Sequence, residues 1–415
     1  MGSRQHLPLG HRLRTDAGRH DAAGVADPRS GPPGRYGERP SRWSRVGPRD
    51  HGEVRVVNAG LGGAPDPNEL EVTLIGPGYG ESVVVHLGGG AWMIVDSCVD
   101  STGEPRPLRY LEQIGVNPAE SVGLVVATHW HDDHIRGMEE VVARCGRARF
   151  CCSAALRTGE FLAAARTLEG RRQSQLGSGV REMHGVFSRL DRSRQPLWAL
   201  ADRRVHRWPT AEVWALSPDD STFERFLQVL ASLTPESGQA KRRLSEPSPN
   251  EVSVVLWLAG GDIVVLLGAD LERAGWARIV AGKARPEGVA SAYKVPHHGS
   301  KGADDPAVWE KLLAPSPMAV VAPWTRGGRV LPTEKDIHRI LDHTRHAYIT
   351  APPRSGGKWK GIREVERTLR ESGAVVRADR ESDGVVRLRR PLDGGTCWSV
   401  ALFGSASRLA DAVAA

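Results

Sequence analysis

The sequence lacks the marks of a membrane-spanning or secreted protein. It contains no run of about eighteen consecutive apolar residues, and its start, MGSRQHLPLGHRLR, has no apolar core of the kind that a secretory signal needs. Cysteine is scarce, with five residues in a chain of 415, and none falls in a paired CxxC zinc pattern. We therefore predict a cytoplasmic protein with reduced thiols and exclude a disulfide-stabilised miniprotein.

The composition is otherwise that of a globular protein, with 40% apolar and 25% charged residues, so wholesale disorder is excluded. The formal net charge of +7 is uneven, because residues 1–50 hold ten arginines against five acidic residues. A general basic surface for nucleic acid therefore does not follow from the charge. Residues 1–52, rich in arginine, glycine and proline, are predicted to form a disordered tail; an arm that touches a polyanion is the alternative.

From residue 53 onward, stretches with strand spacing alternate with helical ones. Predicted strands occupy 54–57, 71–75, 82–87, 92–96, 122–127, 148–153, 212–216, 251–258, 262–267, 291–295, 318–322 and 346–350, and predicted helices 107–114, 133–145, 222–234, 304–313 and 333–343. Two strand-rich halves, each followed by helices, favour two sheets packed face to face with helices outside, a four-layer α/β sandwich. We predict one domain over 53–390, with a helical insertion at about 155–205 and a C-terminal extension over 391–415.

A histidine-rich motif follows the buried strand predicted at 122–127. It reads Thr-His-Trp-His-Asp-Asp-His-Ile-Arg-Gly over 128–137, so four of its side chains fit the pattern HxHxDH. Imidazole and carboxylate are ligands that suit zinc. A strand end followed by a turn and a helix can direct alternate side chains at two nearby points. We expect His129 and His131 to hold one metal, and Asp133 and His134 to hold a second.

The chain resembles the metallo-β-lactamase superfamily through this motif and five further segments in the same order. These are Gly-Tyr-Gly-Glu-Ser at 78–82, Asp-Ser-Cys at 96–98, Asn-Glu-Val-Ser at 250–253, Leu-Gly-Ala-Asp at 267–270 and Lys-Val-Pro-His-His-Gly-Ser at 294–300. The likeness extends from about residue 69 to 350. It is closest to the branch that contains the hydrolase domain of bacterial DNA-uptake (competence) channel proteins.

The resemblance implies an αββα fold and a role for each matching residue. Asp270 matches the carboxylate that bridges both metals, and His297 matches the last ligand of the second metal. His298 is the alternative ligand, or it contacts substrate and donates a proton, so Asp133 and His298 are the candidate catalytic residues. The implied metal ligands are His129, His131, Asp133, His134, Asp270 and His297.

One segment departs from the family pattern. Where the family often supplies a third histidine to the first metal, this chain has Ser-Pro-Asp-Asp at 217–220. Asp219 is a substitute ligand, or water takes that position, or Asp219 caps the helix predicted at 222–234. Asp96 is expected either to support the histidine loop from outside the metal shell or to end a strand without further function. Lys294 and Lys301 either face a phosphate or have no specific role.

The resemblance implies a metal-dependent hydrolase with two divalent ions, Zn²⁺ or else Mn²⁺, and a hydroxide between them as the nucleophile. The branch favours a phosphodiesterase or nuclease, with a nucleic acid or another phosphodiester as substrate and no membrane partner. A hydrolase of small esters, thioesters or lactams is the alternative, since the fold hosts all of these. A third hypothesis is a catalytically weak regulatory module, including one associated with defence against phage.

Overall fold

The structure is a computed structural model that describes residues 55–57, 60–76, 79–156, 178–190, 194–233, 248–282, 284–353, 384–394 and 397–413. These residues all belong to one compact unit, Arg45–Ala415. The predicted tail at 1–52 lies outside the described residues, as do positions 157–177 and 191–193 of the predicted insertion.

Within the described residues, nine strands form the first sheet in the order β1-β18-β17-β2-β3-β4-β5-β6-β7. Its central strands β4, β5 and β6 run parallel, so their carboxyl ends meet at one edge of the sheet. The strands are β1 Arg55–Val57, β2 Glu69–Ile75, β3 Ser82–Leu87, β4 Trp92–Val95, β5 Val122–Ala127, β6 Arg149–Ser153, β7 Leu197–Ala199, β17 Val385–Pro391 and β18 Ser399–Phe403.

The second sheet has eight strands in the described part of the chain, in the order β19-β16-β13-β12-β11-β10-β9-β8. Strands β11, β12 and β13 are parallel neighbours, and a separate pair, β14 with β15, follows β13. The strands are β8 Arg203–Arg207, β9 Ala211–Ala215, β10 Leu256–Gly260, β11 Ile263–Leu267, β12 Ala290–Lys294, β13 Leu313–Val321, β14 Trp324–Arg326, β15 Arg329–Leu331, β16 Ala347–Ile349 and β19 Ser407–Arg408.

The two sheets pack face to face, as the alternation of side chains along each strand requires. In β3, Val83 and Val85 point into the cluster between the sheets, while Val84 points to the outer helices. Strand β11 alternates in the same way, with Val265 between the sheets and Val264 on the outer side. Both strands are apolar throughout because both of their faces are covered.

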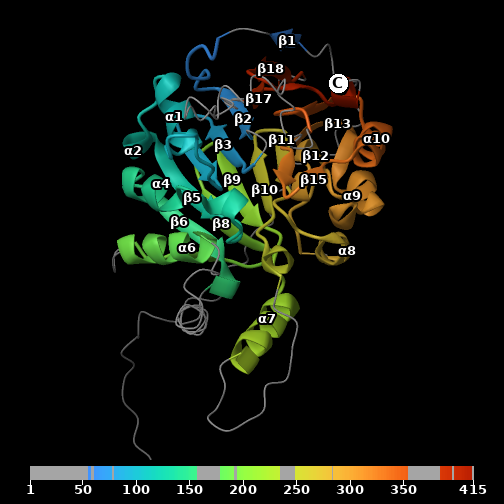
Figure 1. Ribbon diagram of the computed structural model, residues 1–415. Coiled ribbons are helices and arrows are strands. Elements are labelled where there is room, and N and C mark those ends of the chain that lie inside the picture. The colour runs from blue at the N-terminus through green and yellow to red at the C-terminus, as the bar shows by residue number, and fades with distance from the viewer. Residues whose placement is uncertain are drawn as a thin grey trace, which may run out of the picture. The chain divides into compact units, whose positions relative to one another are not determined.

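Helices cover the outer face of each sheet (Figure 1), with α1, α4 and α6 over the first and α8, α9 and α10 over the second. The predicted four-layer αββα sandwich is therefore confirmed. The helices are α1 Arg106–Gln113, α2 Pro118–Ser121, α3 Asp132–Ile135, α4 Met138–Arg144, α6 Ser178–Arg189, α7 Asp220–Leu233, α8 Arg273–Ala281, α9 Pro306–Lys311 and α10 Glu334–His343, with 3-10 turns η1 Ala154–Leu156, η2 Pro249–Val252, η3 His297–Gly299, η4 Lys301–Ala303 and η5 Leu409–Val413. None of the helices in the described residues combines the length and the apolar character that crossing a bilayer requires.

Three segments differ from their predicted structure. The insertion predicted as helical up to residue 205 contains α6, but β7 and β8 near its end are strands that join the first and the second sheet. The stretch predicted as a C-terminal extension contains β18 and β19, which also pair into the two sheets. The strand predicted at 251–258 begins only at Leu256, because the preceding residues form η2 and then hydrogen-bond to the histidine loop, with the Val254 N–H donating to the Thr128 carbonyl at 3.1 Å.

Candidate metal centre

Four strand ends deliver the candidate site residues to one place. Asp96 follows β4, the HxHxDH motif follows β5, Asp270 follows β11, and His298 follows β12. In open sheets with parallel strands, the carboxyl ends form the natural crevice for a ligand. The sandwich brings the ends of both sheets together, so residues 96 and 298, far apart in sequence, contact the same motif.

Left-handed backbone marks these strand ends. Of six non-glycine residues with positive φ in the described chain, four lie here: Asp96 (58°), Ala269 (44°), His297 (47°) and His298 (53°). Each residue in this conformation reduces stability by about 1–3 kcal/mol and persists only where surrounding contacts hold it. Such strain gathers at functional sites, which fits a role for this edge in binding or chemistry.

Gly80 lets the motif approach the first sheet. Its φ is +90°, and a Cβ there would lie 2.9 Å from the Cys98 Cβ and 3.3 Å from the Asp133 carbonyl oxygen. The neighbouring Glu81 N–H donates to that same carbonyl at 2.8 Å. The short helix α3, which carries Asp133 and His134, is therefore fixed against the β2–β3 connection.

Asp270 stands at the centre of the cluster. Its Oδ1 lies 3.2 Å from His134 Nε2, and its Oδ2 lies 3.7 Å from His298 Nε2. His298 Nε2 also lies 3.2 Å from Asp133 Oδ2. All of these side chains are buried, at 10% exposure or less. The predicted association of Asp133, His134 and Asp270 in space is thus what the structure shows, and His298 joins them.

His129 and His131 form the second part of the cluster. His129 is fully buried, and its Nε2 lies 3.2 Å from His131 Nδ1. Its Nδ1 is 2.9 Å from Thr128 Oγ1 and 3.2 Å from Ser253 Oγ. Burial lowers the pKa of both histidines, which favours the neutral imidazole that a metal requires.

Two groups of side chains have donor atoms close enough to share a cation: His129 with His134 and Asp270, and Glu81 with His134 and His298. In the second group, the Lys294 ammonium already contacts Glu81 and lies 3.9 Å from Asp270 Oδ1. A buried ammonium there occupies the place of a cation. The first group is therefore the better metal site.

The donor set of that first group fits a divalent cation. His134 Nε2 and Asp270 Oδ1 are buried, and neither has a hydrogen-bond partner among the described residues, although they lie 3.2 Å apart. Burial alone would lower the pKa of His134, but the carboxylates of Asp270 and Glu81 raise it well above its usual value. Burial likewise opposes ionisation of Asp270, yet His134 and His298 hold its pKa well below normal. So much buried negative charge requires a cation, whether a proton or a metal.

The side of His134 that faces away from this cluster is held by carboxylates. Its Nδ1 lies 2.8 Å from Asp96 Oδ2 and 3.6 Å from Glu81 Oε1. Asp96 also accepts hydrogen bonds from the Thr128 N–H and hydroxyl, both at 2.8 Å. Asp96 thus supports the histidine loop from outside the ligand set, which was one of the two expectations for this residue.

Between the adjacent histidines of η3, distance favours His298. His298 is 2% exposed and reaches both Asp133 and Asp270, whereas His297 Nε2 lies 4.0 Å from Asp270 Oδ2 and its side chain is 24% exposed. The left-handed conformation of both residues turns one ring into the cluster and leaves the other at its edge. The expected ligand role of His297 stays a prediction, and the geometry offers His298 as the stronger candidate.

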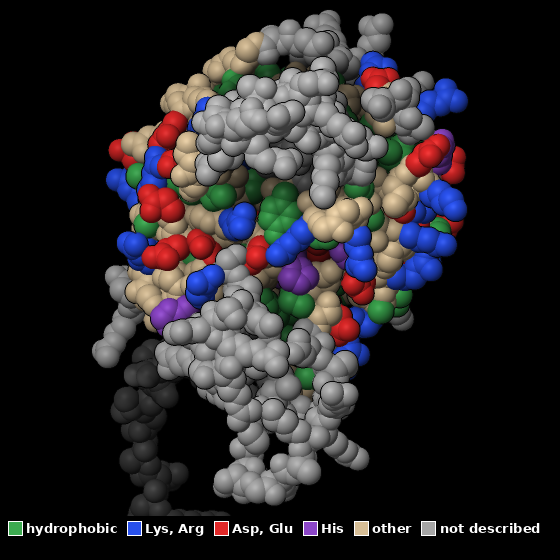
Figure 2. Space-filling model, viewed as in Figure 1, with side chains coloured by type: hydrophobic (Ala, Val, Ile, Leu, Met, Phe, Trp, Pro, Cys, Tyr) green, Lys and Arg blue, Asp and Glu red, His purple; other side chains and the backbone are tan. Residues whose placement is uncertain are grey.

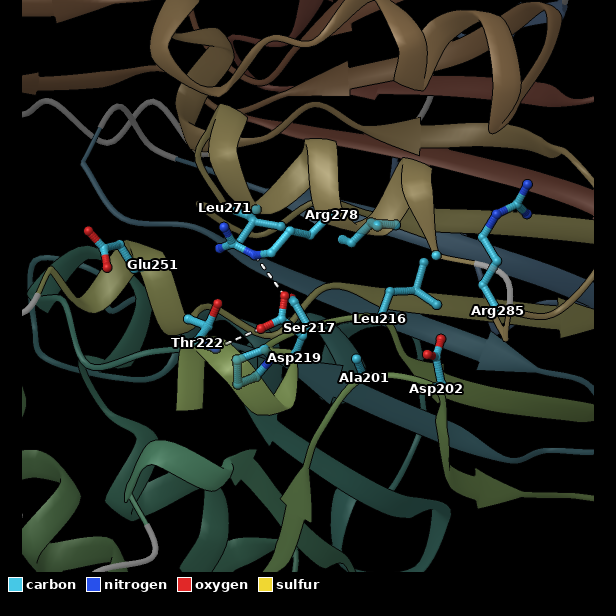
Figure 3. A pocket seen from close by; sticks show the side chains of 14 residues that line it. Ala201, Asp202, Leu216, Ser217, Asp219, Thr222, Glu251, Leu271, Arg278 and Arg285 are labelled. Atoms are coloured by element: carbon cyan, nitrogen blue, oxygen red, sulfur yellow. Dashed lines mark hydrogen bonds and ion pairs between the residues drawn. The ribbon is translucent and has the colours of Figure 1, made fainter. Parts of the chain in front are cut away.

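Asp219 is held by other groups. Its Oδ1 accepts from the Thr222 N–H at 2.6 Å, as a cap of α7, and its Oδ2 pairs with Arg278 Nε at 2.7 Å. Figure 3 shows this pair on the wall of a small pocket of about 150 Å³ that also includes Ser217 and Leu271. Of the three roles considered for Asp219, these contacts support the helix cap.

A cleft of about 900 Å³ opens onto the cluster. On the face of the molecule that Figure 2 shows, a histidine side chain is exposed among basic and apolar side chains. Besides the metal-cluster residues, the wall contains aromatic, aliphatic and arginine side chains. The lining residues are Trp130, His131, Asp132, Asp133, Val180, Asp270, His297, His298, Ser300, Trp324, Arg326, Arg329, Val330, Leu331 and Thr333.

Sequence reasoning missed the roles of Glu81 and Lys294. Glu81 lies in the segment at 78–82, for which no role was predicted, and Lys294 was expected either to face a phosphate or to have no specific role. Lys294 is buried instead, contacts Glu81 and donates to the Ala269 carbonyl at 3.0 Å. A lysine at the end of an otherwise uncharged, buried strand was the available signal, because a buried ammonium needs a carboxylate partner.

Residues 75–211 match a sequence model of the metallo-beta-lactamase superfamily. The match identifies a metallo-beta-lactamase superfamily domain in that part of the chain, and this superfamily includes metal-dependent hydrolases. The HxHxDH motif, the αββα layers and the buried histidine–carboxylate cluster agree with that class.

Solved structures similar to this chain include proteins described as metallo-beta-lactamases or as having the metallo-beta-lactamase fold. The metallo-beta-lactamase fold protein YhfI from Bacillus subtilis is 12% identical, with 55% of this chain and 70% of that chain covered and a TM-score of 0.29. A Cronobacter sakazakii metallo-beta-lactamase with a HARLDQ motif is 14% identical (55% and 75% covered, TM-score 0.32). MEM-A1, a subclass B3 metallo-beta-lactamase from a soil metagenome library, is also 14% identical (55% and 78% covered, TM-score 0.32). Among curated protein sequences, none matches this chain significantly. Similarity at this level transfers neither substrate nor mechanism.

Proposed function

We propose that this protein is a metal-dependent phosphodiesterase with a dinuclear centre. The observation that carries the proposal is the convergence of Asp270 with His134, His298 and Asp133 at the floor of a cleft whose wall contains arginines. Bound divalent cations would lower the pKa of water towards about 7 and stabilise negative charge on the scissile group.

The ligands that would hold these cations fall into two sets. His129 and His131 lie together on one side, and Asp133 and His298 on the other. Asp270 could share a cation with His129 and His134 and also lies 3.7 Å from His298 Nε2, so it is close to both sets, as a carboxylate shared by two ions would be. Zn²⁺ fits this mixture of imidazole and carboxylate, and Mn²⁺ is the alternative.

Hydrogen-bond partners orient the rings of three of these histidines. Asp96 holds Nδ1 of His134, the Thr128 and Ser253 hydroxyls hold Nδ1 of His129, and the Ala322 carbonyl lies 3.1 Å from Nδ1 of His298. Each contact leaves Nε2 as the atom that faces the centre. Ligands oriented in this way bind metal with little reorganisation.

The sequence-based expectation left His298 open as either a metal ligand or the proton donor to the leaving group, and we propose His297 as that donor instead. His298 Nε2 is directed at Asp133 and Asp270, so it suits a ligand. His297 is partly exposed and lines the cleft, so it can reach a substrate and return a proton to the leaving oxygen.

The phosphodiester class is favoured over small esters, thioesters and lactams by Arg326 and Arg329 in the cleft wall, since cationic side chains suit an anionic substrate. The resemblance to the DNA-uptake branch supports the same class and extends it to nucleic acid. Trp130, Val330 and Leu331 make part of the wall apolar, which is the feature that favours the ester or lactam alternative. We also propose a cytoplasmic location, on the sequence features given above.

The test measures metal content and hydrolysis together. Purified protein is reconstituted with Zn²⁺ or Mn²⁺ and assayed with bis(p-nitrophenyl) phosphate, p-nitrophenyl acetate and a chromogenic lactam, with and without chelator. We expect about two metals per chain and chelator-sensitive cleavage of the phosphodiester. Asp270→Ala should lose metal and activity together, while Asp342→Ala, at an exposed position on α10, should retain both.

Preferred cleavage of the acetate or the lactam would replace the proposed substrate class with the alternative. Metal-free protein without turnover on any of the three substrates would favour the regulatory module. In that case the absence of a third histidine near Asp219 would be the reason for weak binding at the first metal position.

A further inference from the structure

The hairpin β14–β15 places two arginines side by side at the wall of the cleft. Gly327 and Gly328 form its turn with φ of +62° and +82°, values that suit a tight two-residue hairpin. Arg326 and Arg329 are direct cross-strand partners on either side of this turn. Both are exposed, and both line the cleft.

This pairing is unfavourable in isolation. Like charges directly opposite one another on two strands destabilise the pair. Among the residues that the structure describes, neither Arg326 nor Arg329 forms an ion pair with a carboxylate, and the side-chain hydrogen bond of Arg326 goes to the Tyr79 hydroxyl, so no ion pair there offsets the repulsion. A bound anion between the two guanidinium groups would balance it.

A third arginine reinforces the positive charge. Arg326 donates to the Tyr79 hydroxyl at 3.2 Å and lies 5.7 Å from the centre of that ring. Arg136, which follows α3, lies 5.5 Å from the same ring centre. Tyr79 therefore contacts two guanidinium groups and connects the hairpin to the residue that follows the helix carrying Asp133.

The hairpin also begins at the metal cluster. Trp324, its first residue, stacks on His298 with the ring centres 6.4 Å apart and the planes at 28°. Strand geometry carries Arg326, two residues later, about 7 Å further along. That advance is comparable to the spacing of consecutive phosphates in a single nucleic-acid strand.

We infer that Arg326 and Arg329 form a second phosphate subsite, which binds the phosphate next to the scissile one in a single-stranded oligonucleotide. This inference rests on the proposed phosphodiesterase function and names its substrate class. The cleft volume of about 900 Å³ lies at the upper end of the range for small-ligand sites, which suits a short single strand rather than a duplex. Trp130 and Trp324 in the same wall supply aromatic surfaces of the kind on which single-stranded bases stack.

The experiment compares two thymidylate substrates that differ by one phosphate. TpT has only the scissile phosphodiester, whereas pTpT carries an additional 5′-phosphate, and 3′-phosphorylated TpTp tests the other polarity. We expect the metal-loaded wild type to cleave one of the phosphorylated forms with a kcat/KM about tenfold or more above that of TpT, since charge-assisted contacts to one phosphate are worth about this factor. Arg326→Gln/Arg329→Gln should abolish this preference.

The matched control is Arg203→Gln/Arg207→Gln, on the edge strand β8, where both arginines are exposed and line neither pocket. It should retain the preference. Equal cleavage of all three substrates by the wild type, or an equal loss of preference in both double variants, would overturn the inference.

Direct binding separates this inference from the proposed function. Fluorescence anisotropy of a labelled oligothymidylate is measured with the metal-loaded wild type and with both double variants, at increasing salt. If no phosphodiester is cleaved but the hairpin variant, Arg326→Gln/Arg329→Gln, alone loses binding, the proposed activity fails and the phosphate subsite stands. If cleavage of bis(p-nitrophenyl) phosphate is robust and the hairpin variant binds as the wild type does, the subsite fails and the activity stands.

Discussion

Replacing Lys294 by methionine should destabilise the metal-free protein by about 3–5 kcal/mol, because it takes the nearest cation away from the buried Glu81 carboxylate and leaves only the more distant His134 and His298 rings, at 3.6 and 3.5 Å, to face it. The side chains of Lys294 and Glu81 are 1% and 2% exposed, so solvent screens their interaction very little. The same substitution removes the donor to the Ala269 carbonyl, a contact of 3.0 Å that is worth about 1 kcal/mol. Methionine approximates the length of the lysine stem, so loss of volume contributes little.

A double-mutant cycle isolates the pair. Glu81→Gln should cost less than Lys294→Met, about 2–3 kcal/mol, because Asp270 at 3.9 Å and the Ala269 carbonyl still face the ammonium. The double variant should cost no more than about 2 kcal/mol, since it removes both charges and leaves neither unpaired. The two single costs therefore exceed the double cost by about 3 kcal/mol or more.

The assay is urea unfolding of chelated protein, followed by fluorescence and by far-ultraviolet circular dichroism. Lys311→Met, at an exposed position on α9, is the matched control and should change the free energy of unfolding by less than about 0.5 kcal/mol. Additive single and double costs would refute the reasoning, because they would show that the two charges do not stabilise each other.

Three further predictions concern the metal cluster. Asp96→Asn should weaken metal affinity about 10- to 100-fold without unfolding the protein, because it alters the contact that orients Nδ1 of His134. Isothermal titration with Zn²⁺ measures the affinity, and an unchanged affinity would contradict this prediction. Gly80→Ala should lower the free energy of unfolding by about 2–4 kcal/mol, since the φ of Gly80 is +90° and the added Cβ would lie 2.9 Å from Cys98 Cβ. Gly63→Ala, where no atom lies near the added Cβ, should change it little in the same urea assay. The chelated protein should lose stability as the pH rises above about 6.5. Burial lowers the folded-state pKa of His134, but the Asp270 carboxylate outweighs burial and raises this pKa well above its usual value. The stabilisation is therefore complete below the unfolded-state pKa and is lost as the pH rises through the folded-state pKa. Melting temperatures across this range measure the effect, and a constant or rising value would be inconsistent with it.

Local features of the fold could be predicted from the sequence. The strands expected at 82–87 and 122–127 coincide with β3 and β5, because a fully apolar run between turn signals leaves little choice of structure. The HxHxDH motif is equally local: its residues lie within one strand end and one helical turn, so their proximity follows from chain geometry alone. The helix predicted at 333–343 also begins where it was expected, because Thr333 and Asp336 form a capping box at the start of α10.

Features that depend on distant pairing could not be predicted in this way. Strands β17 and β18 were not anticipated, because what makes them strands is pairing with β2 and with each other, and β2 lies more than 300 residues earlier in the sequence. The hairpin β14–β15 was missed for the opposite reason: its strands are three residues each, too short to show a period.

The sequence by itself determined the class of chemistry, since imidazole and carboxylate side chains behind a buried strand suit a divalent metal whatever their final arrangement. Only the tertiary structure decided which residues complete the site. Asp219 is directed to Arg278 rather than to the cluster, and His298 rather than His297 is buried against Asp133. Two adjacent histidines have the same chemistry in a sequence, and the left-handed backbone after β12, held by the packing of two sheets, is what gives them different surroundings.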